Sequence, residues 1–138
     1  MSKNPAERYD RAYFDRWYRD PKTRVKSSAA IRRKAALALS VAEYYLERPV
    51  RTVLDVGCGE GNWFPALRSL RKGIRYTGID SSRYAVERYG KARNIRLGSF
   101  ASLEELRLAY SDCQDVAIMS SASVDVFRVS NNGEIKIN

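Results

Sequence analysis

The chain has 138 residues, of which 44% are hydrophobic and 30% charged, with a net charge of +9 and no histidine. This length and composition predict one folded domain with a hydrophobic core, which excludes a chain that is disordered throughout. The lack of histidine excludes Ser-His-Asp and Cys-His catalysis and histidine-ligated zinc, and no metal site is predicted.

Cysteine usage and hydropathy indicate a reducing compartment. Cys58 and Cys113 are the two cysteines, and neither belongs to a CxxC pair. The first ten residues, MSKNPAERYD, lack the apolar run of a signal peptide. No apolar run approaches the roughly 18 residues that a membrane span needs. The sequence therefore predicts a cytoplasmic protein that does not enter a membrane.

Two helices are predicted before residue 50. Tyr9, Tyr13 and Trp17 recur at helical spacing, which indicates a helix over residues 5–20. The side of this helix that carries Tyr13 and Trp17 is expected to pack toward a ligand site, while its arginines stay in solvent. A serine cap and a continuous apolar face predict a second, longer helix over residues 28–48, ended by a proline.

From residue 51 onward, short β-branched segments alternate with segments that suit a helix. Alternation at this spacing predicts βαβ units and a parallel sheet with right-handed crossovers. One of the helices is expected to end at Gly90. The predicted strands cover residues 51–56, 74–79, 94–97 and 116–119, and the predicted helices cover residues 62–71, 82–89 and 102–109.

The most informative segment is VLDVGCGEG, residues 53–61. Gly57, Gly59 and Gly61 stand between a predicted strand and a predicted helix, where the backbone must turn sharply and where a ligand can approach it without meeting a Cβ. The helix that follows presents free N–H groups to the same place. The alternative is a tight βα turn without a ligand, since short glycine motifs also arise by chance.

The spacing of these glycines distinguishes among ligands. A dinucleotide fingerprint, GxGxxG, needs a glycine where this chain has Asn62, and the Gly-Lys-Ser/Thr ending of a P-loop is absent. The pattern that remains is DxGxGxG, from Asp55 to Gly61, with Asp80 at the end of the next strand. A carboxylate at that place can accept hydrogen bonds from both hydroxyls of a ribose, although an aspartate there also caps helices.

With these motifs, the sequence resembles the class I S-adenosylmethionine-dependent methyltransferases. The resemblance is carried by VLDVGCGEG (53–61), YTGIDSS (76–82) and, more weakly, NIRLGSF (94–100). It implies that the chain binds S-adenosyl-L-methionine as its cofactor. It also implies transfer of the methyl group to an acceptor, which the sequence does not identify.

The resemblance implies roles for individual residues. The residue that matches Asp55 orients the methionine amine, and the acid that matches Asp80 binds the ribose hydroxyls. The loop that matches residues 98–100 surrounds the adenine, and Ser99 departs from the aspartate that is common there. No catalytic base is predicted, because methyl transfer depends mainly on positioning the acceptor. The predicted cofactor-binding residues are Asp55, Gly57, Gly59, Gly61, Asp80, Ser81, Ser99 and Phe100.

The predicted fold is α/β, with a Rossmann-like parallel sheet of about four to five strands and flanking helices. Residues 1–50 form an N-terminal helical extension, and residues 51–138 form the cofactor-binding core, irregular after residue 120. The sheet is thus incomplete relative to the seven-stranded fold of the family. An incomplete sheet exposes an edge and an apolar face, so self-association or a partner chain is expected.

Two other functions stay open. One is a non-catalytic module, either a cofactor-binding remnant or a basic RNA-associated protein, because arginines alternate with aromatic residues over 5–20. An amphipathic helix with solvated arginines explains the same pattern and is preferred over RNA binding. The other is a nucleotide-dependent dehydrogenase, which Asn62 disfavours. Cofactor binding and salt-titrated RNA binding would separate these functions.

Overall fold

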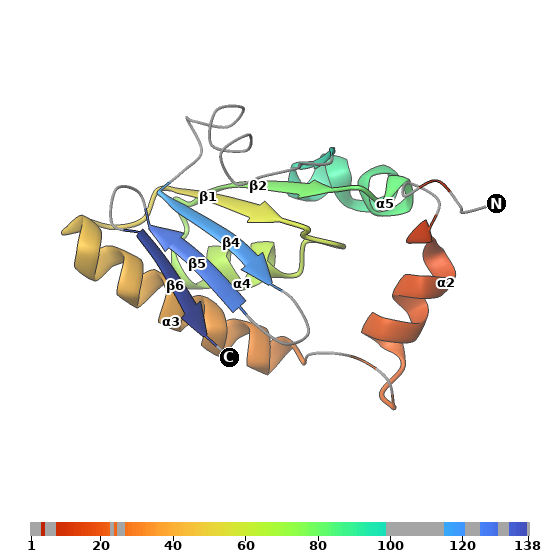
Figure 1. The fold of residues 1–138 in the computed structure, drawn as a ribbon, viewed down its shortest axis with the longest axis horizontal. Helices are drawn as coiled ribbons and strands as arrows, with labels where there is room; N and C mark the ends of the chain where they lie inside the picture. The colour runs from red at the N-terminus through yellow and green to blue at the C-terminus, as the bar shows by residue number, and fades with distance from the viewer. Residues whose placement is uncertain are drawn as a thin grey trace.

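A six-stranded sheet forms the centre of the molecule (Figure 1). The computed structural model describes residues 4, 8–22, 24, 27–98, 115–120, 125–129 and 133–137. The spatial order of the strands is β3-β2-β1-β4-β5-β6. The strands are β1 (Thr52–Val56), β2 (Arg75–Asp80), β3 (Ile95–Leu97), β4 (Val116–Ser120), β5 (Asp125–Val129) and β6 (Gly133–Ile137).

The sheet combines a parallel part with an antiparallel hairpin. β3, β2, β1 and β4 run parallel, whereas β5 and β6 each run antiparallel to the strand before them. Strand order reverses at β1, since β2 lies on one side of it and β4 on the other. Ligands of open α/β sheets bind at such a reversal, beyond the carboxyl ends of the strands. The predicted Rossmann-like parallel sheet is therefore confirmed.

The chain after residue 120 is more regular than the sequence indicates. The prediction of irregular structure there is wrong for residues 125–129 and 133–137, which form β5 and β6. The parallel part has four strands, as predicted, and these two antiparallel strands bring the whole sheet to six. The DVFRV sequence of β5 does not alternate cleanly, but it pairs with β4 along its whole length, with Phe127 opposite Ile118. Pairing with a buried neighbour overrides the weak local pattern.

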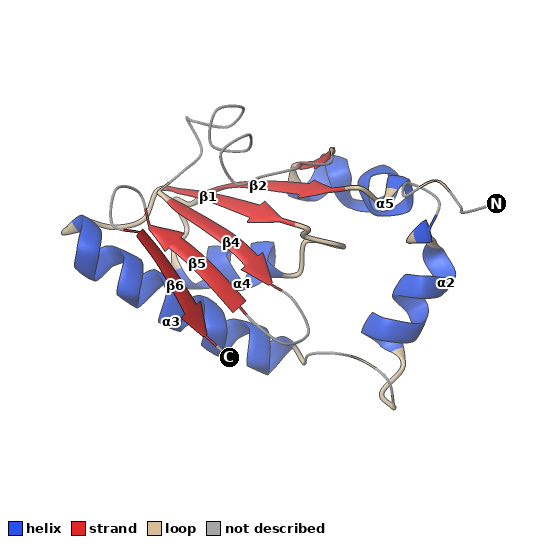
Figure 2. Ribbon diagram, in the orientation of Figure 1, coloured by secondary structure: helices blue, strands red, loops and turns tan. Residues whose placement is uncertain are grey.

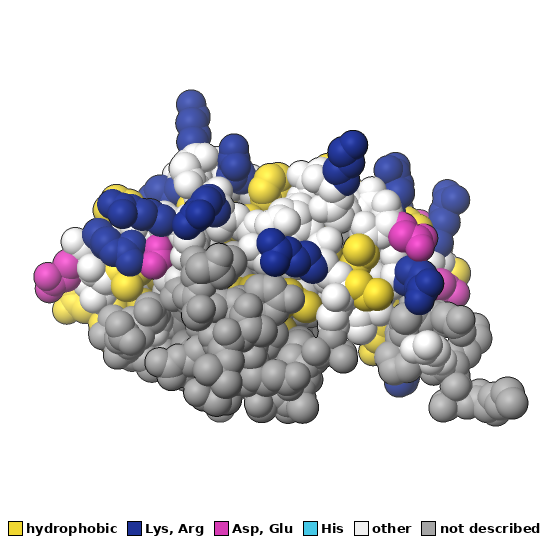
Figure 3. Space-filling model, turned by 90° about the horizontal axis from the view of Figure 1, so that it is seen from above, with side chains coloured by type: hydrophobic (Ala, Val, Ile, Leu, Met, Phe, Trp, Pro, Cys, Tyr) yellow, Lys and Arg dark blue, Asp and Glu magenta, His cyan; other side chains and the backbone are white. Residues whose placement is uncertain are grey.

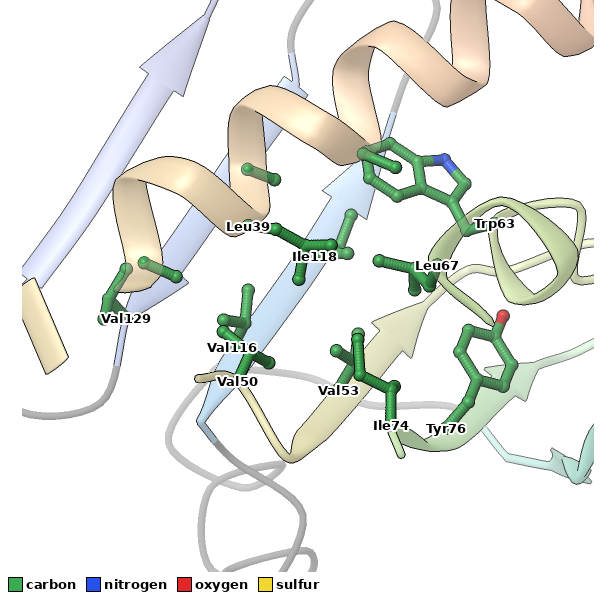
Figure 4. Close-up of a cluster of buried hydrophobic side chains, with 13 residues drawn as sticks. Leu39, Val50, Val53, Trp63, Leu67, Ile74, Tyr76, Val116, Ile118 and Val129 are labelled. Atoms are coloured by element: carbon green, nitrogen blue, oxygen red, sulfur yellow. The ribbon is translucent and has the colours of Figure 1, made fainter. Parts of the chain in front are cut away.

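Helices α3 (Ser28–Leu46) and α4 (Trp63–Leu70) lie side by side on one face of the sheet (Figure 2). Both helices contribute to one hydrophobic cluster with the strands (Figure 4). Because α3 belongs to this cluster, it packs as part of the core; the division of the chain at residue 50 stays a prediction. The buried residues of the cluster are Ala35, Ala38, Leu39, Ala42, Val50, Val53, Trp63, Leu67, Ile74, Tyr76, Val116, Ile118 and Val129.

Helix α5 (Arg83–Arg93) packs along β2 and β3, and its end differs from the prediction. The helix continues through Gly90 and ends before Asn94, which has a left-handed φ of 52°. A Cβ at Gly90 would lie 2.8 Å from the backbone oxygen of Ile95. Gly90 therefore lets the helix approach β3 closely and does not end it. The helix predicted over residues 102–109 lies outside the described residues.

The N-terminal helix is short and changes its pitch. α2 (Arg11–Phe14) is capped by the Asp10 side chain and continues into η1 (Asp15–Arg19), a π-helical turn. The fully buried aromatic residue is Phe14, whereas Tyr13 and Trp17 are only half-buried. Tyr18, in the same turn, is half-buried as well. Figure 1 shows α2 at the end of the molecule toward which β1 and β2 point. Among the described residues, no helix is long and apolar enough to span a membrane.

Candidate functional site

The glycine loop between β1 and α4 occupies the carboxyl end of β1. Gly57, Gly59 and Gly61 have φ values of 68°, 56° and 72°, a region that residues with a side chain rarely adopt. The amides of Gly57 and Cys58 both donate to the backbone oxygen of Ile79, at 2.8 and 3.1 Å. The loop is thus fixed to the end of β2, and its glycines are required by its conformation.

Asp80 joins this loop to the start of α5. Its Oδ2 accepts a hydrogen bond from the Gly59 amide at 2.7 Å, and its Oδ1 accepts one from the Ser82 amide at 2.8 Å. The Ser82 hydroxyl in turn caps α5 by accepting from the Ala85 amide. Ser81 lies between the two and is half-buried. The predicted acid therefore stands directly beside the predicted glycine, although the two are 21 residues apart.

Asp55 lies beneath the loop and is 1% exposed. The Tyr76 hydroxyl donates a hydrogen bond to its Oδ2 at 2.5 Å. The pKa of Asp55 is raised to about 7, because burial and the Asp80 charge raise it by more than the Tyr76 hydrogen bond lowers it. The carboxyl is therefore poised to change charge near neutral pH. Sequence reasoning missed Tyr76, because nothing local to it indicates a partner in β1.

Cys58 fills the space between the loop and β2. A Cβ at Gly78 would lie 2.7 Å from the Cys58 sulfur, so the glycine in β2 makes room for this side chain. Burial, together with the charges of Asp55 and Asp80, raises the pKa of the thiol. The thiol stays protonated and serves as a packed apolar group, because reactivity requires the thiolate.

The N-terminal helix covers the loop. Tyr18 and Phe14 are the nearest side chains to the Cβ position of Gly59, at 2.8 and 3.2 Å. Arg19 forms an ion pair with Glu60, which lies within the loop and is 6% exposed. The sequence does not predict these contacts, because each contact joins residues that lie far apart in the chain.

The structure brings most of the predicted site residues together at the carboxyl ends of β1 and β2. Ser99 and Phe100, expected beside the adenine, lie outside the described residues. The role of the set in cofactor binding stays a prediction. The residues brought together are Asp55, Gly57, Gly59, Gly61, Asp80 and Ser81.

A family model described as a methyltransferase domain matches residues 27–127. No curated protein matches the chain. Among solved structures, the chain is similar to the plantazolicin methyltransferase BpumL, crystallised with a monoazolic desmethyl analogue of plantazolicin and S-adenosylhomocysteine, with a TM-score of 0.50 and 18% identity. The match covers 79% of this chain and 56% of BpumL, so the chain spans little more than half of that protein.

Two further solved structures have lower TM-scores. The plantazolicin methyltransferase BamL has 28% identity and a TM-score of 0.45 over 70% of this chain and 39% of BamL. The bifunctional kinase-methyltransferase WbdD has 14% identity and a TM-score of 0.44 over 75% of this chain and 31% of WbdD.

Proposed function

The chain belongs to the family of methyltransferase domains, and we propose that it binds S-adenosyl-L-methionine at the carboxyl ends of β1 and β2 and passes the methyl group to an acceptor. The observation that carries this proposal is the glycine loop, in which the Gly59 amide is held by the carboxylate of Asp80. An acceptor for ribose hydroxyls thereby stands next to a loop in which every second residue lacks a Cβ atom. When bound, the cofactor would supply a methyl group bonded to a sulfonium sulfur, and this sulfur is a good leaving group because it departs as the neutral thioether of S-adenosylhomocysteine.

Asp80 retains capacity for a ligand. Each of its carboxylate oxygens accepts one backbone amide. Because a carboxylate oxygen has two acceptor positions, both oxygens can still accept from a ribose hydroxyl. We assign Asp80 to binding of the ribose hydroxyls. The glycines let the ligand approach the backbone closely, and Ser81 lies at the rim of the site. The proposal also places Ser99 and Phe100 beside the adenine of the ligand.

Asp55 supplies the charge behind the loop. Its buried carboxyl faces no basic side chain in the contacts that shift its pKa, which are with Tyr76 and Asp80. A cationic group placed against the loop would favour the ionised form of Asp55. We therefore assign Asp55 to the methionine amine of the ligand, acting from beneath the glycines.

Methyl transfer makes modest demands on the rest of the chain. An in-line displacement needs the acceptor held at attack distance and in line with the leaving group. The described residues supply a fixed loop and a covering helix, and they need supply no proton relay. The identity of the acceptor is left open by the proposal.

Calorimetric binding of S-adenosyl-L-methionine and of S-adenosylhomocysteine tests this function. We expect Asp80→Asn to weaken binding by about 1–3 kcal/mol, the range for hydrogen bonds to a charged group. Asp115→Asn is the matched control, since Asp115 also accepts backbone amides, from Arg51 and Thr52, but at the opposite end of β1. The control should lose stability and keep its affinity. Equal affinities for the parent and Asp80→Asn would show that the site is elsewhere.

A basic RNA-associated module is the second candidate. Figure 3 shows that lysine and arginine side chains predominate over acidic ones on the face in view. They are spread over this face rather than gathered in a groove, which favours a solvated surface. RNA affinity with a steep salt dependence, in a protein that does not bind S-adenosylhomocysteine, would favour this candidate. The cytoplasmic location stays a prediction from the sequence.

A further inference from the structure

Residues 8–20, here called the N-terminal cover, lie directly on the glycine loop. Phe14 is 2% exposed, and its ring centroid lies 5.6 Å from that of Tyr84 in α5 and 5.2 Å from that of Tyr18. The Tyr18 hydroxyl lies 2.8 Å from the position that a Cβ on Gly59 would take. The phenol therefore rests against the backbone that the proposed function assigns to the ligand.

Three hydrogen bonds hold the cover in place. Arg19 donates from Nη2 to Oε1 of Glu60 at 2.5 Å and to the Tyr89 hydroxyl at 2.8 Å. The Ser82 hydroxyl donates to the backbone oxygen of Tyr9 at 2.5 Å. These hydrogen bonds reach Glu60 in the glycine loop, Tyr89 in α5 and Ser82 at the start of α5. The cover is thus tied to the two segments that form the candidate site.

The Arg19–Glu60 pair is the contact best suited to hold the cover down. The Glu60 side chain is 8% exposed, whereas that of Arg19 is 42% exposed. A carboxylate that is mostly buried depends on a charged partner. When that partner is removed, the main effect is that the segment held by the pair dissociates faster. Arg93 also contacts Glu60, but through the backbone oxygen, at 2.8 Å.

We propose that Arg19 is a positioning residue of the cofactor site: through Glu60 it holds the cover closed and keeps the Tyr18 phenol against Gly59, where it forms a side wall of the site. This inference rests on the proposed function. The ligand then lies along the loop beside the Tyr18 phenol, and it leaves only after the Arg19–Glu60 pair has separated. Burial, with the neighbouring Tyr13 and Asp80, raises the pKa of Tyr18, so the wall is a neutral phenol.

Dissociation of S-adenosylhomocysteine, followed by stopped flow, tests the inference. Arg19→Met and Glu60→Gln should each speed dissociation by about tenfold, and the double variant should be no faster than either, because all three lack the same pair. Arg19→Lys should restore part of the slow dissociation. The matched control is Arg16→Met, because Arg16 lies in the same turn but has its guanidinium 5.1 Å from the Trp17 ring centroid.

Hydrogen exchange of the loop amides, measured without ligand, gives a second readout. Exchange of residues 57–61 should accelerate in Arg19→Met and remain as in the parent in Arg16→Met. If the parent and Arg19→Met release the ligand at the same rate, the inference is overturned while the proposed function stands. If the parent itself does not bind, the proposed function fails and the inference fails with it. Effects that add in the double variant would also overturn it.

Discussion

Asp55 should make ligand binding depend on pH. Its pKa is about 7 because burial disfavours the charged form, and the Asp80 charge adds to this against the Tyr76 hydrogen bond. If the carboxylate must be charged to hold the ligand's amine, binding below that pKa releases a proton. The affinity for S-adenosylhomocysteine should then rise by up to about tenfold per pH unit below the pKa and level off above it. Calorimetry over this pH range measures the effect, and Asp55→Asn should abolish it.

The same residue should make stability depend on pH in the opposite sense. The pKa of Asp55 is raised from 3.8 to about 7, so the folded chain binds the proton more tightly than the unfolded chain. This contribution to the free energy of unfolding is complete below pH 3.8 and is lost as the pH rises through about 7. Its slope is at most about 1.4 kcal/mol per pH unit. Urea unfolding of the parent and of Asp55→Asn would show whether the difference has this sign.

Two glycines of the loop separate backbone strain from contact with the cover. Gly57→Ala introduces a Cβ that meets nothing within 4 Å, at a φ of 68°. It should cost only the strain of the left-handed conformation, about 1–2 kcal/mol. Gly59→Ala, at a φ of 56°, adds a collision with the Tyr18 hydroxyl at 2.8 Å. It should cost more, and Tyr18→Ala should reduce the excess, leaving the close contact with Phe14 at 3.2 Å. Equal costs in thermal unfolding would mean that Tyr18 does not rest on the loop.

The sequence predicts residues whose role depends on neighbouring residues in the chain, and it misses residues whose contacts form only when distant segments come together in the fold. The three glycines and Asp80 could be predicted because a sharp βα turn and a strand end leave a short, recognisable pattern. Tyr18, Glu60 and Tyr76 could not, since their partners lie 21 or more residues away. Ser99 and Phe100 stay predictions.

The ends of α3 and α5 provide a matched test at the scale of the elements. Glu47 follows α3 with a φ of 53°, and Asn94 follows α5 with a φ of 52°. Glu47→Gly should stabilise the fold by about 0.5–1 kcal/mol, because glycine relieves the strain. Asn94→Gly should destabilise it by about 1 kcal/mol instead, because it removes the Asn94 side-chain Nδ2, which donates to the Tyr76 backbone oxygen at 2.8 Å. Stabilisation by both variants in urea unfolding would contradict this.

Elements with a strong period could be predicted, and those shaped by their neighbours could not. The long helix before β1 and the first parallel strands follow local patterns, and they are observed within a few residues of the predicted ranges. In the π-helical turn Asp15–Arg19, Tyr18 and not Trp17 lies against Gly59, which a search for helical spacing misses. The predicted helix end at Gly90 is wrong for a related reason. The small size of Gly90 allows a close contact with Ile95, and the helix continues past it.

In the whole molecule, the sheet that the described residues form ends on β3 at one side and on β6 at the other. β3 is 3 residues long and β6 is 5 residues long, so β6 offers the longer edge. A free edge presents backbone donors and acceptors to another chain. The expected self-association is therefore best placed at β6, where a second copy could extend the antiparallel part of the sheet.

Proline substitutions in β6 test this placement. Neighbouring residues in a strand turn their N–H groups to opposite sides, so of Ile135 and Lys136 one donates toward β5 and the other toward the open edge. We expect the parent's average mass in sedimentation velocity to rise with concentration. One proline variant should break the β5–β6 pairing and lower the melting temperature. The other should keep the melting temperature and reduce assembly, because proline removes the outward donor. A parent that stays monomeric at all concentrations would show that this edge needs no partner.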